Sequence, residues 1–313
     1  MMQSQSNCFE VLAAIDVGSN TIKMTVAQSD GAGGLIELHH DADTVRLGAG
    51  IAVGTALDPA RAERALTALA RFADDARALG ASRLFGVATE ALRLASDGQA
   101  FVEEAEAQTG WSLDIITGTE EASLTFAGLR DFVQSDERTL IADIGGGSTE
   151  VIWTHHGNLS EARSLPIGSG RLTDQWIHTD PPSQAEFTAC SEAVAGLLQA
   201  NLQERTSPGQ QIDRIIVSGG TGVYLGVLLG QNLDIDVAAL QRAVTILTSC
   251  PSGDLAVHLG IPLERARVLL AGVATVCSLA EWFSPAPIDV VESGLRRGLL
   301  AREFAHVHDK PTS

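Results

Sequence analysis

Hydrophobic and polar positions alternate at the start of the chain as they do in β-strands. Apolar runs at 11–15 and 22–27 flank a short polar turn at 16–21, and another run follows near 35–39. Two such runs around a Gly/Asn turn predict a hairpin. Helical spacing begins after Asp58-Pro59, an N-cap residue followed by a proline, and Gly80 supplies the stop.

Strand-like and helix-like segments then alternate along the rest of the chain. Strands are predicted at 83–88, 112–117, 139–143, 212–217 and 288–292. Helices are predicted to end near Gly110, to start near Glu120, and to cover 184–205, and a glycine turn is predicted at 218–222. This order predicts an α/β protein in which sheets are covered by helical layers.

The pattern of the opening hairpin recurs later in the sequence. Asp-x-Gly-Ser-Asn-Thr begins at Asp16, and Asp-x-Gly-Gly-Gly-Ser-Thr begins 127 residues later at Asp143. Each motif follows an apolar run. Because the spacing is that of one domain, we expect two similar halves, which agrees with the length of 313 residues.

Composition narrows the function classes. The net charge of −18 argues against a general nucleic-acid or anionic-membrane binder, so an anionic substrate needs a local cluster of donors. The four scattered cysteines, including Cys8, and the lack of a visible secretory signal favour a reduced, cytoplasmic protein. The longest uncharged stretch, 215–233, is broken by glycines, which is untypical of a membrane span.

The paired glycine turns indicate phosphate chemistry. Such turns expose backbone N–H groups and let phosphate oxygens approach closely. An Asp at the end of the preceding strand can hold Mg²⁺ against those oxygens. One turn alone is weak evidence, but two matching turns facing each other across a cleft between the halves predict a phosphate-handling site.

Further motifs allow a comparison with known families. Besides the two turns, the chain contains Ala-Thr-Glu-Ala-Leu-Arg at 88–93 and Gly-Thr-Glu-Glu-Ala at 118–122, in the same order and spacing as family members. The chain therefore resembles the exopolyphosphatase / guanosine pentaphosphate phosphohydrolase family. This resemblance implies two ribonuclease-H-like domains of the actin, Hsp70 and sugar-kinase superfamily around an interdomain cleft. The domains would be 1–124, with a C-terminal helix at about 300–313, and 125–299.

The resemblance also implies roles for particular residues. Glu121 matches the general base for the attacking water, and Asp143 and Glu150 match the acids that hold Mg²⁺, with Glu150 also assisting the base. Arg93 matches the phosphate-binding arginine. The expected substrate-binding set is completed by Asp16, Gly18, Ser19, Asn20, Lys23, Gly145, Gly146, Gly147 and Ser148.

Some of these residues also have plainer interpretations. Glu120 and Glu121 at a helix start could simply complement the helix dipole, and Lys23 could lie on an edge strand without reaching the cleft. Arg46 and Arg171 are weaker phosphate candidates on glycine loops. Ser123 and Arg297 depart from the family pattern, in which many relatives carry Arg and Glu.

The expected activity is Mg²⁺-dependent release of terminal orthophosphate from inorganic polyphosphate. Hydrolysis of guanosine pentaphosphate is the nearest alternative, followed by an ATP-dependent kinase and a non-catalytic polyphosphate or nucleotide sensor. The expected partners are polyphosphate or guanosine pentaphosphate, with no nucleic acid and no membrane, and a homodimer is left open.

Overall fold

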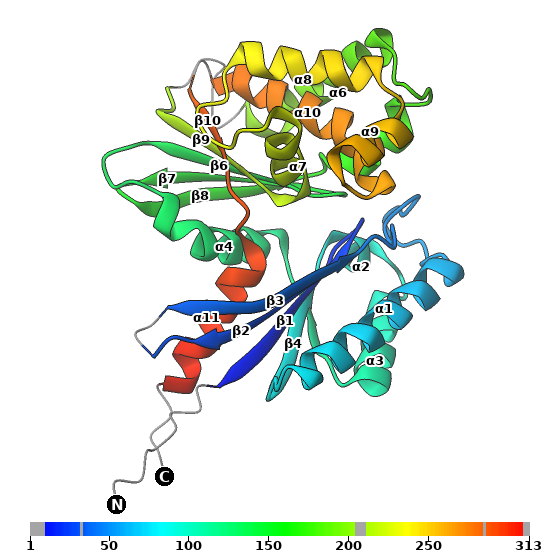
Figure 1. Cartoon of the computed structure of the whole chain (residues 1–313), viewed down its shortest axis with the longest axis vertical. Helices are drawn as coiled ribbons and strands as arrows, with labels where there is room; N and C mark the ends of the chain where they lie inside the picture. Colours follow the sequence, from blue (N-terminus) through cyan, green and yellow to red (C-terminus); the bar gives the residue numbers. More distant parts are fainter. Residues whose placement is uncertain (1–9, 32–33, 204–210, 284–285, 309–313) are drawn as a thin grey trace, which may run out of the picture.

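The computed structural model describes residues 10–31, 34–203, 211–283 and 286–308, arranged as two α/β units (Figure 1). The first contains β1 (Val11–Val17), β2 (Ile22–Ser29), β3 (Leu35–Asp43), α1 (Pro59–Ala78), β4 (Arg83–Ala88), α2 (Glu90–Leu94), α3 (Gly98–Thr109) and β5 (Ser112–Ile115). The second contains β6 (Thr139–Ile144), β7 (Thr149–His155), β8 (Asn158–Leu165), α5 (Ser169–Trp176), α6 (Gln184–Leu202), β9 (Arg214–Ser218), α7 (Gly219–Leu229), α8 (Val237–Ser249), α9 (Ser252–Leu259), α10 (Leu263–Phe283) and β10 (Ile288–Val290). Helix α4 (Gly118–Leu129), the 3₁₀ turn η1 (Arg130–Phe132) and α11 (Leu295–His308) lie where the units meet.

The two sheets share one topology. The first has the order β3-β2-β1-β4-β5 and the second the order β8-β7-β6-β9-β10. In each, three antiparallel strands are followed by two strands parallel to the central one. The predicted internal repeat is therefore confirmed at the level of the sheets.

Alternating side chains of the first sheet pack into two separate layers. Ala13 and Ile15 face the layer of α1 and α3, where Trp111 is buried and its indole N–H donates to the Leu69 carbonyl at 2.9 Å. Leu12 and Ala14 face the other way, onto α11. This period of two is the pattern read in the sequence, because successive strand residues point to opposite faces.

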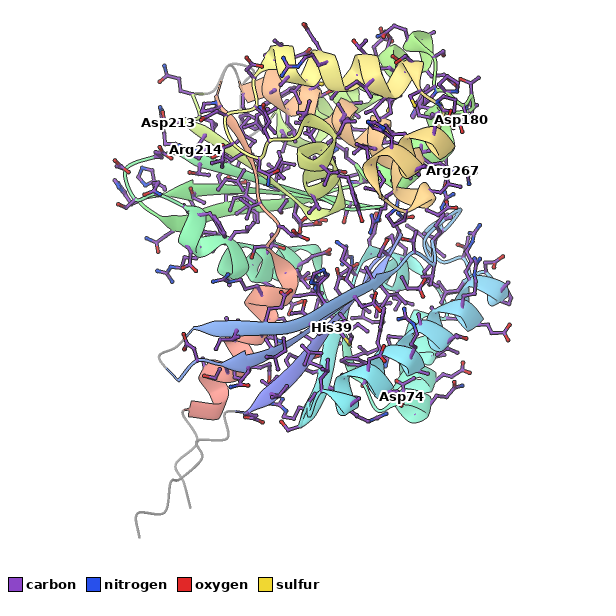
Figure 2. All side chains as sticks on the ribbon, viewed as in Figure 1. His39, Asp74, Asp180, Asp213, Arg214 and Arg267 are labelled. Atoms are coloured by element: carbon purple, nitrogen blue, oxygen red, sulfur yellow. The ribbon has the colours of Figure 1, made fainter. Side chains whose placement is uncertain are left out.

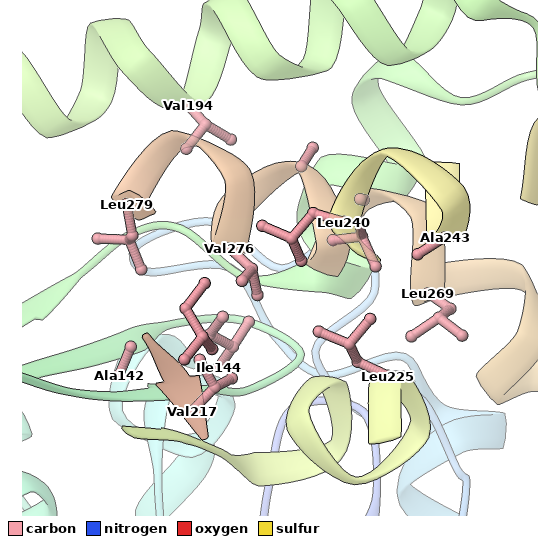
Figure 3. Close-up of a cluster of buried hydrophobic side chains, with 14 of the residues drawn as sticks. Ala142, Ile144, Val194, Val217, Leu225, Leu240, Ala243, Leu269, Val276 and Leu279 are labelled. Carbon is pink, nitrogen blue, oxygen red and sulfur yellow. The ribbon is translucent and has the colours of Figure 1, made fainter. Parts of the chain in front are cut away.

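The second sheet has the same two-sided arrangement. Figure 3 shows Ala142, Ile144 and Val217 of the sheet beneath apolar residues of α10. The opposite face packs against α4 through Ile141 and Ile216. By length and composition α10 could cross a membrane, yet most of it is buried in this core.

Helices α4 and α11 cross where their backbones touch. A Cβ added at Gly298 would lie 1.9 Å from the Leu124 carbonyl oxygen, and one added at Gly128 would lie 2.0 Å from the Gly294 carbonyl oxygen. Only glycine fits at these two positions, so the crossing brings the units together without intervening side chains.

Local predictions are mostly confirmed. Asp58 caps α1 by accepting from the Arg61 N–H at 2.9 Å. The glycine turn predicted at 218–222 is wrong: Gly219, with φ of 77°, turns the chain out of β9 directly into α7. Of the helix expected at 184–205, residues 204–205 lie outside the described part, and α6 ends at Leu202.

The C-terminal helix is α11; it begins at Leu295, and residues 309–313 of the expected range are not described. The proposed domain limits stay a prediction, and the limit at 124/125 falls inside α4. Cys190, Cys250 and Cys277 are free thiols, while Cys8 lies outside the described residues.

Candidate active site

The turns of the two equivalent hairpins enclose a narrow cavity of about 60 Å³ between the units. It is lined by nearly every residue predicted from the sequence: Asp16, Gly18, Ser19, Asn20, Lys23, Glu121, Asp143, Gly145, Gly146, Gly147, Ser148 and Glu150. Arg93 lies outside this lining and contacts Glu121 instead. The structure thus brings together residues far apart in the sequence, although their chemical roles stay predictions.

Equivalent positions in the two hairpins carry different charges. Asp16 pairs with Lys23 across β1 and β2, and Asp143 pairs with Glu150 across β6 and β7. Lys23 and Glu150 are both seven residues beyond their aspartates, so they occupy corresponding places in the repeat. The cavity therefore has a cation on one side where it has an acid on the other.

Glu121 reaches the cavity because its neighbour completes the start of α4. The Glu120 carboxylate accepts from the Thr117 N–H at 2.8 Å, and the Thr117 hydroxyl accepts from the Glu120 N–H at 3.2 Å. This is a capping box, so Glu120 serves the helix terminus. Glu121 is 7% exposed and, unlike Glu120, lines the cavity.

Arg93 fixes the orientation of Glu121. Its Nη1 donates to the Ile116 carbonyl at 2.7 Å and to Glu121 Oε2 at 3.3 Å. The two acceptors hold the guanidinium beside the carboxylate, so Arg93 is positioned to balance negative charge at that end of the cavity.

Burial and neighbouring acids raise the pKa values of the two glutamates in the cavity. Burial, and next the neighbouring Asp143, raise the pKa of Glu150 to about 8, although Ser164 donates to its Oε1 at 2.7 Å. Burial, then Glu150 and Asp16, raise the pKa of Glu121 well above its usual value, against the effect of Arg93. A carboxyl group with a raised pKa is suited to accept a proton.

The same crowding suits a divalent cation. Within the described chain, no three His, Cys, Asp or Glu side chains are grouped so that they could hold a metal by themselves. Mg²⁺ needs fewer, because it commonly takes one or two carboxylates together with water and substrate phosphates. Asp143 and Glu150 fit that donor set, and the buried Oδ1 of Asp16 lacks a hydrogen-bond partner among the described residues.

Two further arginines, which the sequence reasoning did not assign, lie beside Lys23. Arg265 of α10 is 7% exposed and donates to the Thr21 hydroxyl of the other unit, and Gly220 leaves room for it, since a Cβ there would lie 2.7 Å from Arg265 Nη1. Arg296 of α11 donates through Nε to the Thr25 hydroxyl at 2.9 Å.

These cations line a second cavity of about 460 Å³ that shares Asp16, Lys23 and Asp143 with the first. Burial, followed by repulsion from Arg265 and Arg296, lowers the pKa of Lys23 to about 8. The cations gather on one part of this cavity, whose lining also includes the acids Asp16, Glu37, Asp41, Asp143 and Glu292. Nothing in the sequence around Arg265 predicted this place in the cleft.

Glu90, which was also not assigned a role from the sequence, lies between the glycine turns at 18–20 and 145–148. It is 6% exposed, accepts from Arg171 at 2.7 Å and accepts from the Ser19 hydroxyl at 3.4 Å. A Cβ at Gly147 would lie 1.7 Å from Glu90 Oε2, so a larger residue there would displace the Glu90 side chain. Burial is the main cause that raises the pKa of Glu90.

A second ion pair runs in the opposite direction between the units. Arg46 of the first unit pairs with Asp174 of the second, whereas Arg171 of the second pairs with Glu90 of the first. The two weaker phosphate candidates are thus already engaged with acids, on the side of the turns away from Lys23.

The two departures from the family pattern lie outside the lining of the small cavity. The Ser123 hydroxyl donates to the Thr119 carbonyl at 2.9 Å within α4. Arg297 pairs with Asp131 at 2.8 Å and borders the larger cavity.

Comparisons with known proteins identify relatives of the chain. Two relatives similar in sequence are the guanosine-5'-triphosphate,3'-diphosphate pyrophosphatase of Pseudoalteromonas translucida (28% identical; 96% of this chain and 60% of the relative) and exopolyphosphatase 1 of Mycobacterium leprae (26% identical; 94% and 89%). The chain thus spans less than two thirds of the first relative's length.

Solved structures show the same fold. They include an exopolyphosphatase from Cytophaga hutchinsonii (TM-score 0.83, 20% identity, covering 95% of this chain and 98% of that one) and a Ppx/GppA family member from Aquifex aeolicus (TM-score 0.76, 24% identity, covering 96% and 100%). The expected two-unit α/β fold is confirmed. The Ppx/GppA phosphatase family profile matches residues 25–306, and the chain belongs to that family.

Proposed function

We propose that the protein is a Mg²⁺-dependent exopolyphosphatase, which releases terminal orthophosphate from inorganic polyphosphate with a water activated by Glu121. The observation that carries this proposal is the placement of a buried glutamate of raised pKa, oriented by Arg93, in a small cavity walled by two glycine turns.

The residues of the chain supply positioning and charge balance, which dominate phosphoryl transfer. The Glu121 carboxylate takes a proton from water as the water oxygen bonds to the terminal phosphorus, and the bond from that phosphorus to the bridging oxygen breaks. Glycine turns at 18–20 and 145–148 present backbone N–H groups to phosphate oxygens. Mg²⁺, held by Asp143 and Glu150 together with the substrate, would neutralise charge on those oxygens.

The unequal cavities support attack at a chain end. The 60 Å³ cavity has room for little more than a terminal phosphoryl group. Lys23 and Arg265 line both this cavity and the adjoining 460 Å³ cavity, and Arg296 lines the larger one alone. A polyanionic leaving chain would lie along these cations, held by charge and without recognition of a base.

Guanosine pentaphosphate is the second candidate substrate. Tyr224 and His40 border the larger cavity, where their rings could contact a nucleoside, and the Arg265 guanidinium lies over one face of the Tyr224 ring, 5.6 Å from its centre. The same catalytic groups would act, with a different leaving group. A kinase would instead need a base directed at a substrate hydroxyl.

The test measures orthophosphate release in Mg²⁺ from short polyphosphate, long polyphosphate and guanosine pentaphosphate. Glu121→Gln keeps the shape of the side chain but removes the base, and we expect turnover to fall by about 10²–10⁴-fold. The matched control is Glu120→Gln, the adjacent acid that serves the helix cap, which we expect to retain turnover.

Each outcome decides between the candidates. Release from polyphosphate that is lost in Glu121→Gln supports the exopolyphosphatase, and release from guanosine pentaphosphate alone replaces it with the second candidate. No release from any of the three substrates, or equal rates in wild type and Glu121→Gln, refutes the proposal.

A further inference from the structure

A third cavity, of about 220 Å³, lies on the far side of the glycine turns from the 460 Å³ cavity. It shares Ser19, Asn20, Gly146 and Gly147 with the small catalytic cavity, but shares no lining residue with the 460 Å³ cavity. The catalytic cavity therefore lies between the other two. The 460 Å³ cavity is the proposed place of the leaving chain, whereas the 220 Å³ cavity has no role in the proposed function.

Three residues that line this third cavity each carry a buried N–H donor without an acceptor among the described residues. The donors are Asn20 Nδ2, Arg46 Nε and Arg171 Nε. Buried polar groups in proteins are nearly always hydrogen-bonded, so each exception needs a physical explanation. Since all three are donors, the missing partner must be an acceptor, and several acceptor oxygens on one small molecule would satisfy them together.

The charges around the cavity favour a small oxyanion over a large polyanion. Arg46 is paired with Asp174 and Arg171 with Glu90, so the surrounding acids offset most of the positive charge. Both pairs engage a terminal nitrogen, Nη2, and leave Nε free. A tetrahedral oxyanion can accept from such guanidinium edges while the ion pairs stay intact.

We propose that this cavity binds orthophosphate after its release, on the side of the turns opposite to the leaving chain. The identity of the anion as product rests on the proposed function, whereas the oxyanion site itself rests on the three donors. In this structure the turns touch: a Cβ at Gly146 would lie 2.3 Å from Asn20 Cβ, and one at Gly147 would lie 2.5 Å from Ser19 Oγ. Transfer of orthophosphate thus requires the turns to separate.

The first test locates the anion directly. Crystals of the full-length Glu121→Gln variant are soaked in tungstate, a tetrahedral oxyanion with strong anomalous scattering. We expect an anomalous peak between Arg46 and Arg171, with or without one in the catalytic cavity. Tungstate confined to the catalytic cavity, or water alone beside the three donors, overturns the proposal.

The second test separates product from substrate. Arg46→Lys and Arg171→Lys keep the positive charge for Asp174 and Glu90 but remove the Nε donor. We expect the inhibition constant of orthophosphate to rise about tenfold, equivalent to 1.4 kcal/mol, and to rise more than KM for tripolyphosphate. The control is Arg138→Lys, whose partner Asp213 lies at the outer edge of the second unit (Figure 2).

The outcomes distinguish the two proposals. An unchanged inhibition constant, or an equal rise in the inhibition constant and KM, shows that the cavity does not serve product and overturns the assignment. If wild-type protein releases no orthophosphate from any substrate, the proposed function fails, and the tungstate soak alone then decides whether an oxyanion site exists.

Discussion

Gly298→Ala perturbs the crossing of α4 and α11 and tests the link between that crossing and catalysis. Helix propensity alone predicts a gain, because Ala is favoured over Gly inside a helix by roughly 0.5–1 kcal/mol. The structure predicts a loss. The new Cβ would lie 1.9 Å from the Leu124 carbonyl oxygen and 2.9 Å from the Gly128 nitrogen, both backbone atoms that cannot rotate away.

The magnitude follows from the displacement that relieves this contact. Ordinary carbon contacts lie near 3.5 Å, so the helices must separate by about 1.5 Å, and overpacking of this kind typically costs 1–3 kcal/mol. Because α4 also carries Glu121, the same displacement moves the base, and a misplacement of about 1 Å can reduce turnover by about 10²-fold.

Thermal unfolding and turnover are measured together, with Gly196→Ala as the matched control. Gly196 lies inside α6 with open space where its Cβ would be, so this variant should be as stable as wild type or more stable. We expect a lower melting temperature and lower kcat for Gly298→Ala only. Identical behaviour of the two variants would refute the backbone contact at the crossing.

Three further predictions follow from charge. Glu121 must be ionised to act as a base, and its pKa is raised, first by burial and then by Glu150, so kcat/KM should fall with decreasing pH at a higher pH than for an ordinary glutamate. Arg93→Gln should move that limb of the pH–rate profile to still higher pH, and an unmoved limb would contradict the influence of Arg93 on Glu121. Lys23, with a pKa lowered by burial to about 8, is charged below that pH, so KM for polyphosphate should rise as pH passes 8, and Lys23→Arg should abolish the rise. Burial alone would raise the pKa of Glu186, but hydrogen bonds from Thr179 and the Ser183 cap lower it to about 2. The stability it contributes is complete above pH 4.5 and is lost as pH falls toward 2, so urea midpoints of wild type and Glu186→Gln should converge at low pH.

The hairpins and their acids could be predicted because their signals are local. Asp16 and Asp143 each end an apolar run before a glycine turn. Because side chains alternate between the two faces of a strand, the hairpin pairing then determines which residues lie beside them, Lys23 and Glu150. Glu121 was identifiable because a motif distinguishes it from its neighbour Glu120, which has the same chemistry and almost the same position.

Other site residues could not be placed from local signals, although Glu90 lies within the motif at 88–93. Glu90 and Arg265 reach the cleft only through tertiary packing, since one emerges after β4 and the other from a helix more than 170 residues later. The turn at Gly219 was misread because a left-handed glycine serves equally well at a strand-to-helix junction and in a hairpin, and the residues that follow it decide which forms.

The exchange of Lys23 for Glu150 between equivalent positions has a consequence for direction. An unbranched polyphosphate reads the same from either end, and a cleft built from two identical halves would accept it in both orientations with equal free energy. The charge difference between the halves removes that degeneracy. A polyphosphate bound in this cleft would therefore have one favoured orientation, and after each cleavage the shortened chain would advance from the same side.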